Sequence, residues 1–212
     1  MAKPGLFILG ASGHAKVLAD AVLAENVWDC IGFIEKRGAT DASYRGISVI
    51  GYDDELPALM EKYGVSHAII GVGENRLRKK IADALQAQCP ELNWATVVHP
   101  MAWVSPSVRI GGGSVMMAGS IIQANSQIGK HCIVNTSASL DHDSSLGDFA
   151  SLGPGTHTGG DVYIGGASSI GIGVSIKQGI RIGANSTIGA GSTVVSDIPD
   201  EVVAFGSPAR IQ

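Results

Sequence analysis

The chain has 212 residues, a formal net charge of −4 and a hydrophobic fraction of 45%, with 29 glycines and only 5% aromatic residues. This length allows one large domain or two small ones. The negative charge and the lack of a basic stripe argue against a nucleic-acid partner, and no run approaches the roughly 18 apolar residues of a membrane span.

The three cysteines are few, odd in number and without metal-site spacing, and the apolar run at the start is too short for a signal peptide. We therefore expect a reduced, cytoplasmic protein.

Residues 1–98 alternate strand-like and helix-like stretches. Strands are expected at residues 6–9, 28–34, 67–72 and 92–98, and helices from the turn after the first strand to about residue 25, at 53–63 and at 75–88. This alternation predicts a small parallel sheet with helices on its faces, an α/β N-terminal domain. His99 and Pro100 begin the linker into a second domain, residues 99–212.

The first strand-to-helix turn contains Gly10, Gly13 and His14. Glycine allows a ligand to approach the backbone closely, and a helix N-terminus favours an anion such as phosphate. The full dinucleotide fingerprint is absent, so NAD binding is not expected. Two alternatives stay open: a glycine turn that only packs helix on strand, and a helix-start histidine that faces solvent.

From Val104 to Pro199 the sequence repeats every six residues through sixteen units. Fifteen of the sixteen first positions are Val, Ile, Leu or Met, the exception being Thr158. A period of six fits neither a helix nor a single strand and is typical of a parallel β-helix. Three units per coil give a triangular prism with 18 residues per turn.

The fourth position of each unit supports this prediction. It is Gly, Asn or Asp in eleven of the sixteen units. These residue types tolerate a positive φ, which a sharp corner between short strands requires. The handedness of the coil does not follow from these residues.

Four segments together resemble a known family: GASGH at residues 10–14, GVGENRLRKK at 71–80, NTSASLDHDSSLGDF at 135–149 and GSPAR at 206–210. They are similar to segments of the bacterial nucleotide-sugar N-acetyltransferases and the related sialic acid O-acetyltransferases, which are hexapeptide-repeat acyltransferases. The resemblance implies a left-handed β-helix, a homotrimer, and acetyl-CoA as co-substrate in the groove between neighbouring β-helices.

His142 is the expected general base, because it occupies an outward-facing corner position of its unit. A histidine with a pKa near the working pH contributes roughly 10²–10⁴-fold in that role. A neighbouring carboxylate orients the ring and raises its basicity. Asp141 and Asp143 both flank it, and the resemblance places Asp143 in this role, although an aspartate there also suits the corner geometry.

The 18-residue coil places Gly160 one turn away from His142 on the same corner. The resemblance implies that its N–H stabilises the thioester oxyanion, a contribution typically worth about 2.7–4 kcal/mol. Ile172 and Ala190 share a second corner column, and the resemblance implies that they line the CoA groove. Ser151 is also expected near acetyl-CoA, at a position where some relatives have a second histidine.

For the sugar nucleotide, the resemblance implies a site in the N-terminal domain. The expected contacts are Gly13, His14, Ala15, Glu35, Lys36 and Gly73. The loop that begins at Glu35 departs from the paired acids that relatives present to the nucleotide base, so the base is left open.

We therefore expect a cytoplasmic, homotrimeric enzyme that transfers acetyl from acetyl-CoA to the amine of a nucleotide-linked amino sugar. Direct transfer is expected, because no cysteine or serine is identified in an activated pair. A sugar O-acetyltransferase of the sialic acid type is the main alternative. A non-catalytic β-helix and a zinc carbonic anhydrase are minor ones; no metal is expected, since His131, His142 and His157 are spaced 11 and 15 apart.

Overall fold

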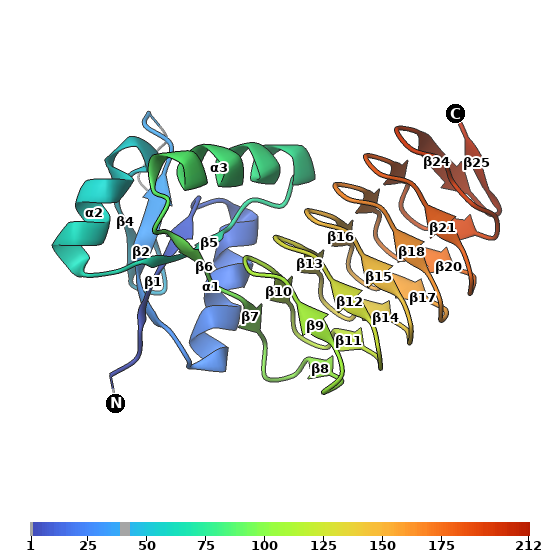
Figure 1. Ribbon diagram of the computed structural model, residues 1–212, viewed down its shortest axis with the longest axis horizontal. Coiled ribbons are helices and arrows are strands. Elements are labelled where there is room, and N and C mark those ends of the chain that lie inside the picture. The colour runs from blue at the N-terminus through green and yellow to red at the C-terminus, as the bar shows by residue number, and fades with distance from the viewer. Residues whose placement is uncertain (1, 39–42) are drawn as a thin grey trace. The chain divides into compact units, whose positions relative to one another are not determined.

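The structure is a computed structural model that describes residues 2–38 and 43–212. The chain divides into two compact units, Met1–Val97 and Val98–Gln212 (Figure 1). The division falls inside the short strand β7 (Val97–Val98), one residue before the predicted boundary.

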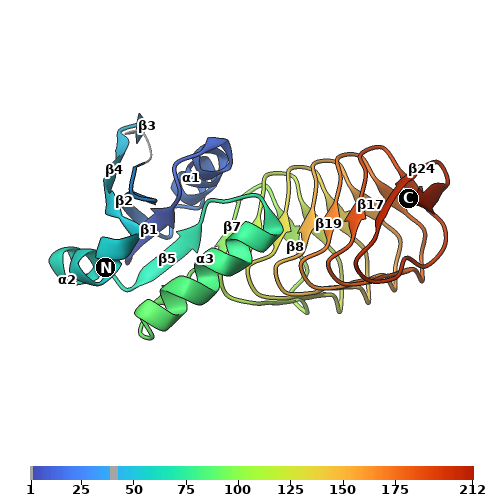
Figure 2. The same ribbon diagram turned by 90° about the horizontal axis from the view of Figure 1, so that it is seen from above.

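The first unit is an α/β domain built on one sheet with the strand order β3-β4-β2-β1-β5-β6. The strands are β1 (Gly5–Leu9), β2 (Asp29–Glu35), β3 (Ser43–Tyr44), β4 (Ile47–Tyr52), β5 (His67–Ile70) and β6 (Asn93–Trp94). All neighbours pair in parallel except β3 and β4. Helix α1 (Gly13–Glu25) covers one face, and α2 (Leu56–Tyr63) and α3 (Asn75–Gln88) cover the other (Figure 2).

The predicted elements are present with three differences. The stretch 53–63 begins as a 3-10 turn, η1 (Asp53–Glu55), before α2 starts. The stretch 92–98 is two short strands, β6 and β7, rather than one. The β3–β4 hairpin was not predicted, and it makes the edge of the sheet antiparallel.

The switch in strand order lies at β1, which has β2 on one side and β5 on the other. Its side chains are almost fully buried. The chain leaves β5 at Gly71, whose N–H donates to the Leu9 carbonyl at 2.7 Å. A Cβ at Gly71 would lie 2.6 Å from that of Ala15, so only glycine lets this loop pack on α1. The crevice for ligands therefore opens at the ends of β1 and β5.

The second unit is a parallel β-helix with three faces, each named here by one of its strands. The β14 face contains β8 (Trp103–Val104), β11 (Ile121–Ile122), β14 (Ser139–Leu140), β17 (His157–Thr158), β20 (Ser175–Ile176) and β23 (Thr193–Val194). The β15 face contains β9 (Arg109–Ile110), β12 (Gln127–Ile128), β15 (Ser145–Leu146), β18 (Tyr163–Ile164) and β21 (Arg181–Ile182). The β16 face contains β7, β10 (Val115–Met116), β13 (Ile133–Val134), β16 (Ser151–Leu152), β19 (Ser169–Ile170), β22 (Thr187–Ile188), β24 (Val203–Gly206) and β25 (Ala209–Ile211).

The register confirms the 18-residue coil: Ile121 pairs with Ser139, and Ser139 pairs with His157. The first positions of the units, such as Leu140 and Leu146, point inward and form one continuous apolar core. The coil is left-handed, as the resemblance implied.

The corners confirm the prediction of positive φ and extend it. Fourth-position residues adopt φ near +55 to +81° in fourteen units, including Asp143 and Asn185. They also include Phe149 and Ala167, residue types that rarely adopt this conformation. Stacking on the coils above and below therefore overrides local preference.

Buried serine hydroxyls tie successive coils together. Ser168 Oγ donates to the Gly183 carbonyl at 2.6 Å and accepts from the Ser186 N–H at 3.0 Å. Ser114 and Ser126 make the same pair of bonds to groups 15 and 18 residues further on. Each hydroxyl thus satisfies corner groups that the strand ladders leave unpaired.

The last unit departs from the repeat. Ile182 pairs with Ile198, sixteen residues away rather than eighteen. The regular six-residue repeat, which the sequence suggested as far as Pro199, is therefore shortened in its last unit. After it, the antiparallel strands β24 and β25 cover the end of the β-helix.

Replacing Ser168 by alanine should lower the free energy of unfolding by about 1–3 kcal/mol, because it leaves a buried N–H and a buried carbonyl without their partner. The measurement is denaturant unfolding at one fixed protein concentration, because association also shifts stability. Ser196→Ala, at an exposed position of the last unit, is the matched control and should change stability by less than about 0.5 kcal/mol. Equal stability of the two variants would contradict the role of the hydroxyl.

Candidate active site

His142 lies in the turn between β14 and β15, at a corner of the prism that we call the His142 corner. Its Nδ1 is 2.8 Å from Oδ2 of Asp143, and both side chains are more than half exposed. Because Nδ1 is occupied by the carboxylate, the neutral ring presents Nε2 as its proton acceptor. The pair predicted from the sequence is thus formed, with Asp143 rather than Asp141 as the partner of the ring.

Asp143 is itself held in place from two sides. Its N–H donates to the Ala124 carbonyl at 2.9 Å, and Asn125 Nδ2 donates to its other carboxylate oxygen at 3.2 Å. The hydrogen bond to Asp143 raises the pKa of His142 above its usual value. The bonds from His142 and Asn125 lower the pKa of Asp143. A charged carboxylate therefore accompanies the imidazole over the pH range in which the ring titrates.

Gly160 lies directly against the imidazole, since a Cβ built on it would be 2.5 Å from Nε2 of His142. The N–H of Asp161 donates to the His142 carbonyl at 2.9 Å and fixes the two coils in register. No described group accepts a hydrogen bond from the Gly160 N–H. A cavity of about 350 Å³ beside this corner is lined by His142, Gly160, Asp161, Gln178 and Gly179. Gly160, whose N–H has no described partner, and the His142 imidazole thus line the same space.

The residues expected to bind acetyl-CoA do not all gather there. Ile172 and Ala190 lie one coil apart in the corner column between the β16 and β14 faces, here the Ile172 corner, where Gly191 N–H donates to the Ile172 carbonyl at 2.8 Å. Ile172 is 61% exposed. Ser151 is half-buried on the β16 face. Within one chain, then, Gly160 shares a corner with His142, and the other three lie on another edge or face of the prism.

A serine–histidine pair that the sequence argument did not identify lies on the β14 face. Ser139 Oγ is 2.8 Å from Nδ1 of His157. Counting 18 residues from Ser139 would have found this pair in the sequence. No described carboxylate forms an ion pair with His157, so the orienting acid of a catalytic triad is missing.

In the first unit, the Glu35 carboxylate binds backbone groups of the first turn. Its Oε2 accepts from the Ala11 N–H at 2.8 Å, and its Oε1 accepts from the Lys36 N–H at 2.9 Å. The carboxylate is thus engaged by backbone donors and shapes the turn that follows Gly10, whose φ is +97°. Each carboxylate oxygen thus accepts one backbone hydrogen bond, and Glu35 also lines the cavity at this end of the sheet.

His14 and Gly73 lie next to each other, with the ring 3.8 Å from the position of a Cβ on Gly73. Burial lowers the pKa of His14 to about 4, and the charge of Arg78 acts in the same direction. Its Nε2 is buried without a partner among the described residues. Arg78 is almost fully buried and donates to the Gly73 carbonyl at 2.8 Å. The turn therefore offers a neutral imidazole held beside a rigid loop.

Gly13 is exposed, with open space where a side chain would be, whereas Ala15 is buried against the sheet. The structure brings Gly13, His14 and Gly73 to one end of the sheet. Ala15 contributes packing, and its side chain is not accessible.

A cavity of about 200 Å³ opens at the same end of the sheet. Its lining comprises Leu9, Gly10, Ile34, Glu35, Lys36, Asp53, Val72, Leu77, Ile81 and Leu85. Apolar walls with a few polar groups are typical of a small-molecule site. Lys36 lines it as expected, and Asp53 is a polar group that the sequence analysis had not selected.

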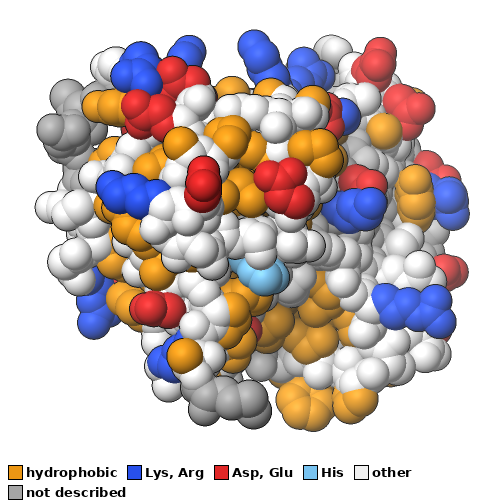
Figure 3. Space-filling view, turned by 60° about the vertical axis from the view of Figure 1, so that its left-hand side comes forward, with side chains coloured by type: hydrophobic (Ala, Val, Ile, Leu, Met, Phe, Trp, Pro, Cys, Tyr) orange, Lys and Arg blue, Asp and Glu red, His pale blue; other side chains and the backbone are white. Residues whose placement is uncertain are grey.

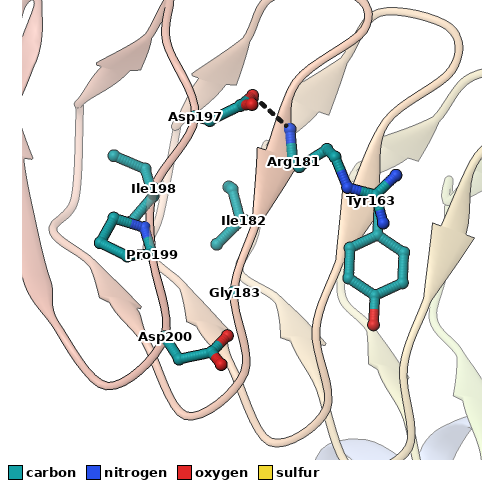
Figure 4. A pocket seen from close by; sticks show the side chains of 8 residues that line it. All are labelled: Tyr163, Arg181, Ile182, Gly183, Asp197, Ile198, Pro199 and Asp200. Atoms are coloured by element: carbon teal, nitrogen blue, oxygen red, sulfur yellow. Dashed lines mark hydrogen bonds between the residues drawn. The ribbon is translucent and has the colours of Figure 1, made fainter.

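A larger hollow of about 530 Å³ lies on the β15 face near the end of the chain (Figure 4). Its two carboxylates are engaged: Asp197 accepts from the Arg181 N–H at 2.8 Å, and Asp200 accepts from the Ala184 N–H at 2.7 Å. Arg181 stacks over Tyr163, with 4.5 Å between the guanidinium carbon and the ring centroid. These side chains support the shortened last coil, and none was expected at a site.

Three further features concern metal binding, surface charge and membrane insertion. No group of three or more His, Cys, Asp or Glu side chains in the described part of the chain could hold a metal ion. On the face drawn in Figure 3, acidic and basic side chains are interspersed. Within residues 2–38 and 43–212, none of the helices is long and apolar enough to cross a bilayer.

The sequence analysis did not identify several residues near His142, and most of them can be found by counting in steps of 18 residues, the length of one coil. Asn125 is 18 residues before Asp143, and Gln178 is 36 residues after His142. Ser126 Oγ donates to the Asp141 carbonyl at 2.8 Å and accepts from the Ser144 N–H, so it fixes both ends of the His142 turn.

Comparison with known proteins identifies similar sequences and structures for both units of the chain. Residues 5–85 match the family model of the PglD N-terminal domain. The whole chain aligns with 98% of a GDP-perosamine N-acetyltransferase from Caulobacter crescentus, crystallised with CoA and GDP-perosamine, at 36% identity and a TM-score of 0.92. It also aligns with all of the acetyltransferase domain of PglB from Neisseria gonorrhoeae FA1090, in complex with acetyl coenzyme A, at 36% identity and a TM-score of 0.90.

A curated relative, the uncharacterized protein L142 of Acanthamoeba polyphaga mimivirus, is 33% identical over 109 residues, which are 51% of this chain and 20% of that protein. The chain thus spans about a fifth of that relative's length. The two aligned acetyltransferases, in contrast, are matched along nearly their full length by both units. The chain belongs to the hexapeptide-repeat family of nucleotide-sugar N-acetyltransferases.

Proposed function

We propose that this protein transfers the acetyl group of acetyl-CoA to the amine of a nucleotide-linked amino sugar. The observation that carries this proposal is the His142–Asp143 pair beside the free N–H of Gly160, in a chain that aligns end to end with an N-acetyltransferase bound to CoA and GDP-perosamine. The N-acetyl reaction is favoured over O-acetyl transfer because the full-length relatives named above include this N-acetyltransferase.

In the proposed reaction the sugar amine attacks the thioester carbonyl carbon, so that a C–N bond forms and the C–S bond breaks. The amine proton passes to Nε2 of His142, whose imidazolium is stabilised by Asp143. The Gly160 N–H donates to the oxygen on which negative charge develops. The proton on His142 then neutralises the departing CoA thiolate, and the products are an N-acetyl sugar and free CoA.

Direct transfer is consistent with the positions of the nucleophilic side chains. Cys89 and Cys132 are buried, and burial raises the pKa of the Cys30 thiol to about 11. A neutral thiol is a poor nucleophile. The Ser139–His157 pair has no orienting acid among the described residues. His142 therefore acts on the amine itself.

The proposed acetyl-CoA site requires two copies of the chain. The His142 corner and the Ile172 corner are different edges of one prism, joined by the β14 face. One acetyl-CoA could contact both if the His142 corner of one copy faced the Ile172 corner of the next, as in a closed ring. This supports the homotrimer as part of the proposal. Because acetyl-CoA is a cytoplasmic metabolite, a cytoplasmic location follows from the same proposal.

In the first unit, the sugar nucleotide would occupy the end of the sheet. Gly13, His14 and Gly73 surround the opening where a diphosphate would meet the N-terminus of α1. The apolar cavity that Lys36 lines would take the base. Glu35 would act indirectly, by holding the Ala11 N–H and thus the turn.

Replacing His142 by alanine should reduce kcat at least a hundredfold, because no described group can take its place as base at that corner. The measurement is thiol release from acetyl-CoA with nucleotide-linked amino sugars, and calorimetry should show acetyl-CoA binding unchanged. His157→Ala is the matched control, an exposed histidine on the β-helix, and should retain turnover. Near-normal turnover of His142→Ala would remove this residue from the catalytic role.

Asp143→Asn tests the electrostatic part of the mechanism. The base must be neutral to act, so activity rises as pH increases through the pKa of His142. Asp143 raises that pKa, so the asparagine variant should move the acidic limb of the kcat–pH profile to lower pH while lowering the maximal rate. The full pH profile is the readout. An acidic limb that stays in place or moves to higher pH would contradict the assignment.

Subunit complementation tests the shared site. His142→Ala and Ala190→Trp should each be nearly inactive, the second because indole fills the CoA groove. Refolding them together in equal amounts should restore about a quarter of wild-type activity, since random mixing gives about one interface in four with both intact partners. If the mixture stays as inactive as its components, acetyl-CoA does not lie between copies.

A further inference from the structure

The cavity in the first unit, here called the slot, is lined mainly by apolar side chains. Leu9 and Ile34 come from the ends of β1 and β2, and Leu77, Ile81 and Leu85 come from one side of α3. A second hollow of about 190 Å³ shares several lining residues with it, so the two are continuous. The combined space is large enough for a purine, and apolar side chains from the strands and from α3 are available to pack against the ring.

The polar groups of this slot are few. Glu35 is engaged by the backbone N–H groups of Ala11 and Lys36. Asp54 and Glu55 line neither hollow, and both bind Arg37, at 2.9 and 2.8 Å. Among the carboxylates that line the slot, Asp53 is the one with an oxygen to which no described group donates.

The Asp53 carboxylate keeps most of its accepting capacity. Its Oδ1 accepts from the Asp54 N–H at 3.0 Å, and no described residue donates to its Oδ2. Lys36 and Lys80 also line the space, and neither forms an ion pair with a described acid. The slot thus combines one double acceptor with two flexible cationic donors.

These groups select among the nucleic-acid bases. Guanine presents two adjacent donors, N1–H and the N2 amino group, with the acceptor O6 beside them. A carboxylate can accept from both donors at once, while a lysine ammonium donates to O6. Uracil presents one donor between two carbonyl acceptors, and adenine and cytosine each place a ring acceptor beside their amino group. A carboxylate on any of these three edges gains one hydrogen bond and meets a repelling oxygen or nitrogen.

We propose that Asp53 reads the Watson–Crick edge of guanine, and that the sugar nucleotide of this enzyme is therefore linked to GDP. This inference rests on the proposed function, because it names the nucleotide of that same substrate. Lys36 or Lys80 supplies the donor to O6, and the leucine and isoleucine side chains of α3 cover one face of the ring.

The test compares GDP and UDP as ligands of the full-length protein by calorimetry. The wild type should bind GDP at least tenfold more tightly than UDP. Asp53→Asn should weaken GDP binding by about 10- to 100-fold, because its amide group repels one guanine donor, and should change UDP binding less than threefold. Asp54→Asn is the matched control, an adjacent aspartate outside both hollows, and should leave both affinities unchanged.

Equal affinity of the wild type for GDP and UDP would overturn the inference, and this comparison needs no folded variant. Asp53→Asn with equal losses for both nucleotides would overturn it as well. A turnover assay separates this proposal from the reaction on which it depends. Acetylation of UDP-linked but not GDP-linked amino sugars would refute guanine recognition and leave N-acetyl transfer standing. Acetylation of neither would refute the proposed function itself.

Discussion

The stacking of identical 18-residue coils is the constraint on which the rest of the β-helix depends. Each short strand pairs only with the strands one coil before and after it, so residues 18 apart form columns. One such column brings His142 and Gly160 together, and another brings Asn125 and Asp143 together. Backbone pairing between coils therefore brings these side chains together from separate turns of the β-helix.

The same constraint explains how an exposed His–Asp pair can be well positioned. Exposed ion pairs usually contribute little to stability and cost side-chain entropy. Here Asp143 is in a left-handed corner conformation, its N–H is bonded to Ala124, and Ser126 fixes the backbone on both sides of His142. The scaffold has already ordered the backbone, so the pair can stay accessible to substrate and still be preorganised.

In the first unit, irregular loops at the end of the sheet are held by side chains rather than by a repeat. Two charged side chains do this by binding backbone groups: Glu35 holds the Ala11 N–H, and the buried guanidinium of Arg78 holds the Gly73 carbonyl. Hydrogen bonds between a charged group and the backbone are stronger than neutral ones. Both side chains thus support the loops at this end of the sheet, where His14 Nε2 and Asp53 Oδ2 have no partner among the described residues.

The sequence by itself determined the β-helix, the coil length, the positive-φ corners and the column of His142 and Gly160, because each follows from a strict period. It also determined most elements of the α/β domain, although it missed the β3–β4 hairpin and placed one continuous strand where β6 and β7 are separate. Only the tertiary structure decided that Asp143 rather than Asp141 pairs with the ring, that Glu35 is engaged by the backbone, and that Ser139 pairs with His157. These features depend on side-chain direction and on contacts between distant segments, which a one-dimensional period does not encode.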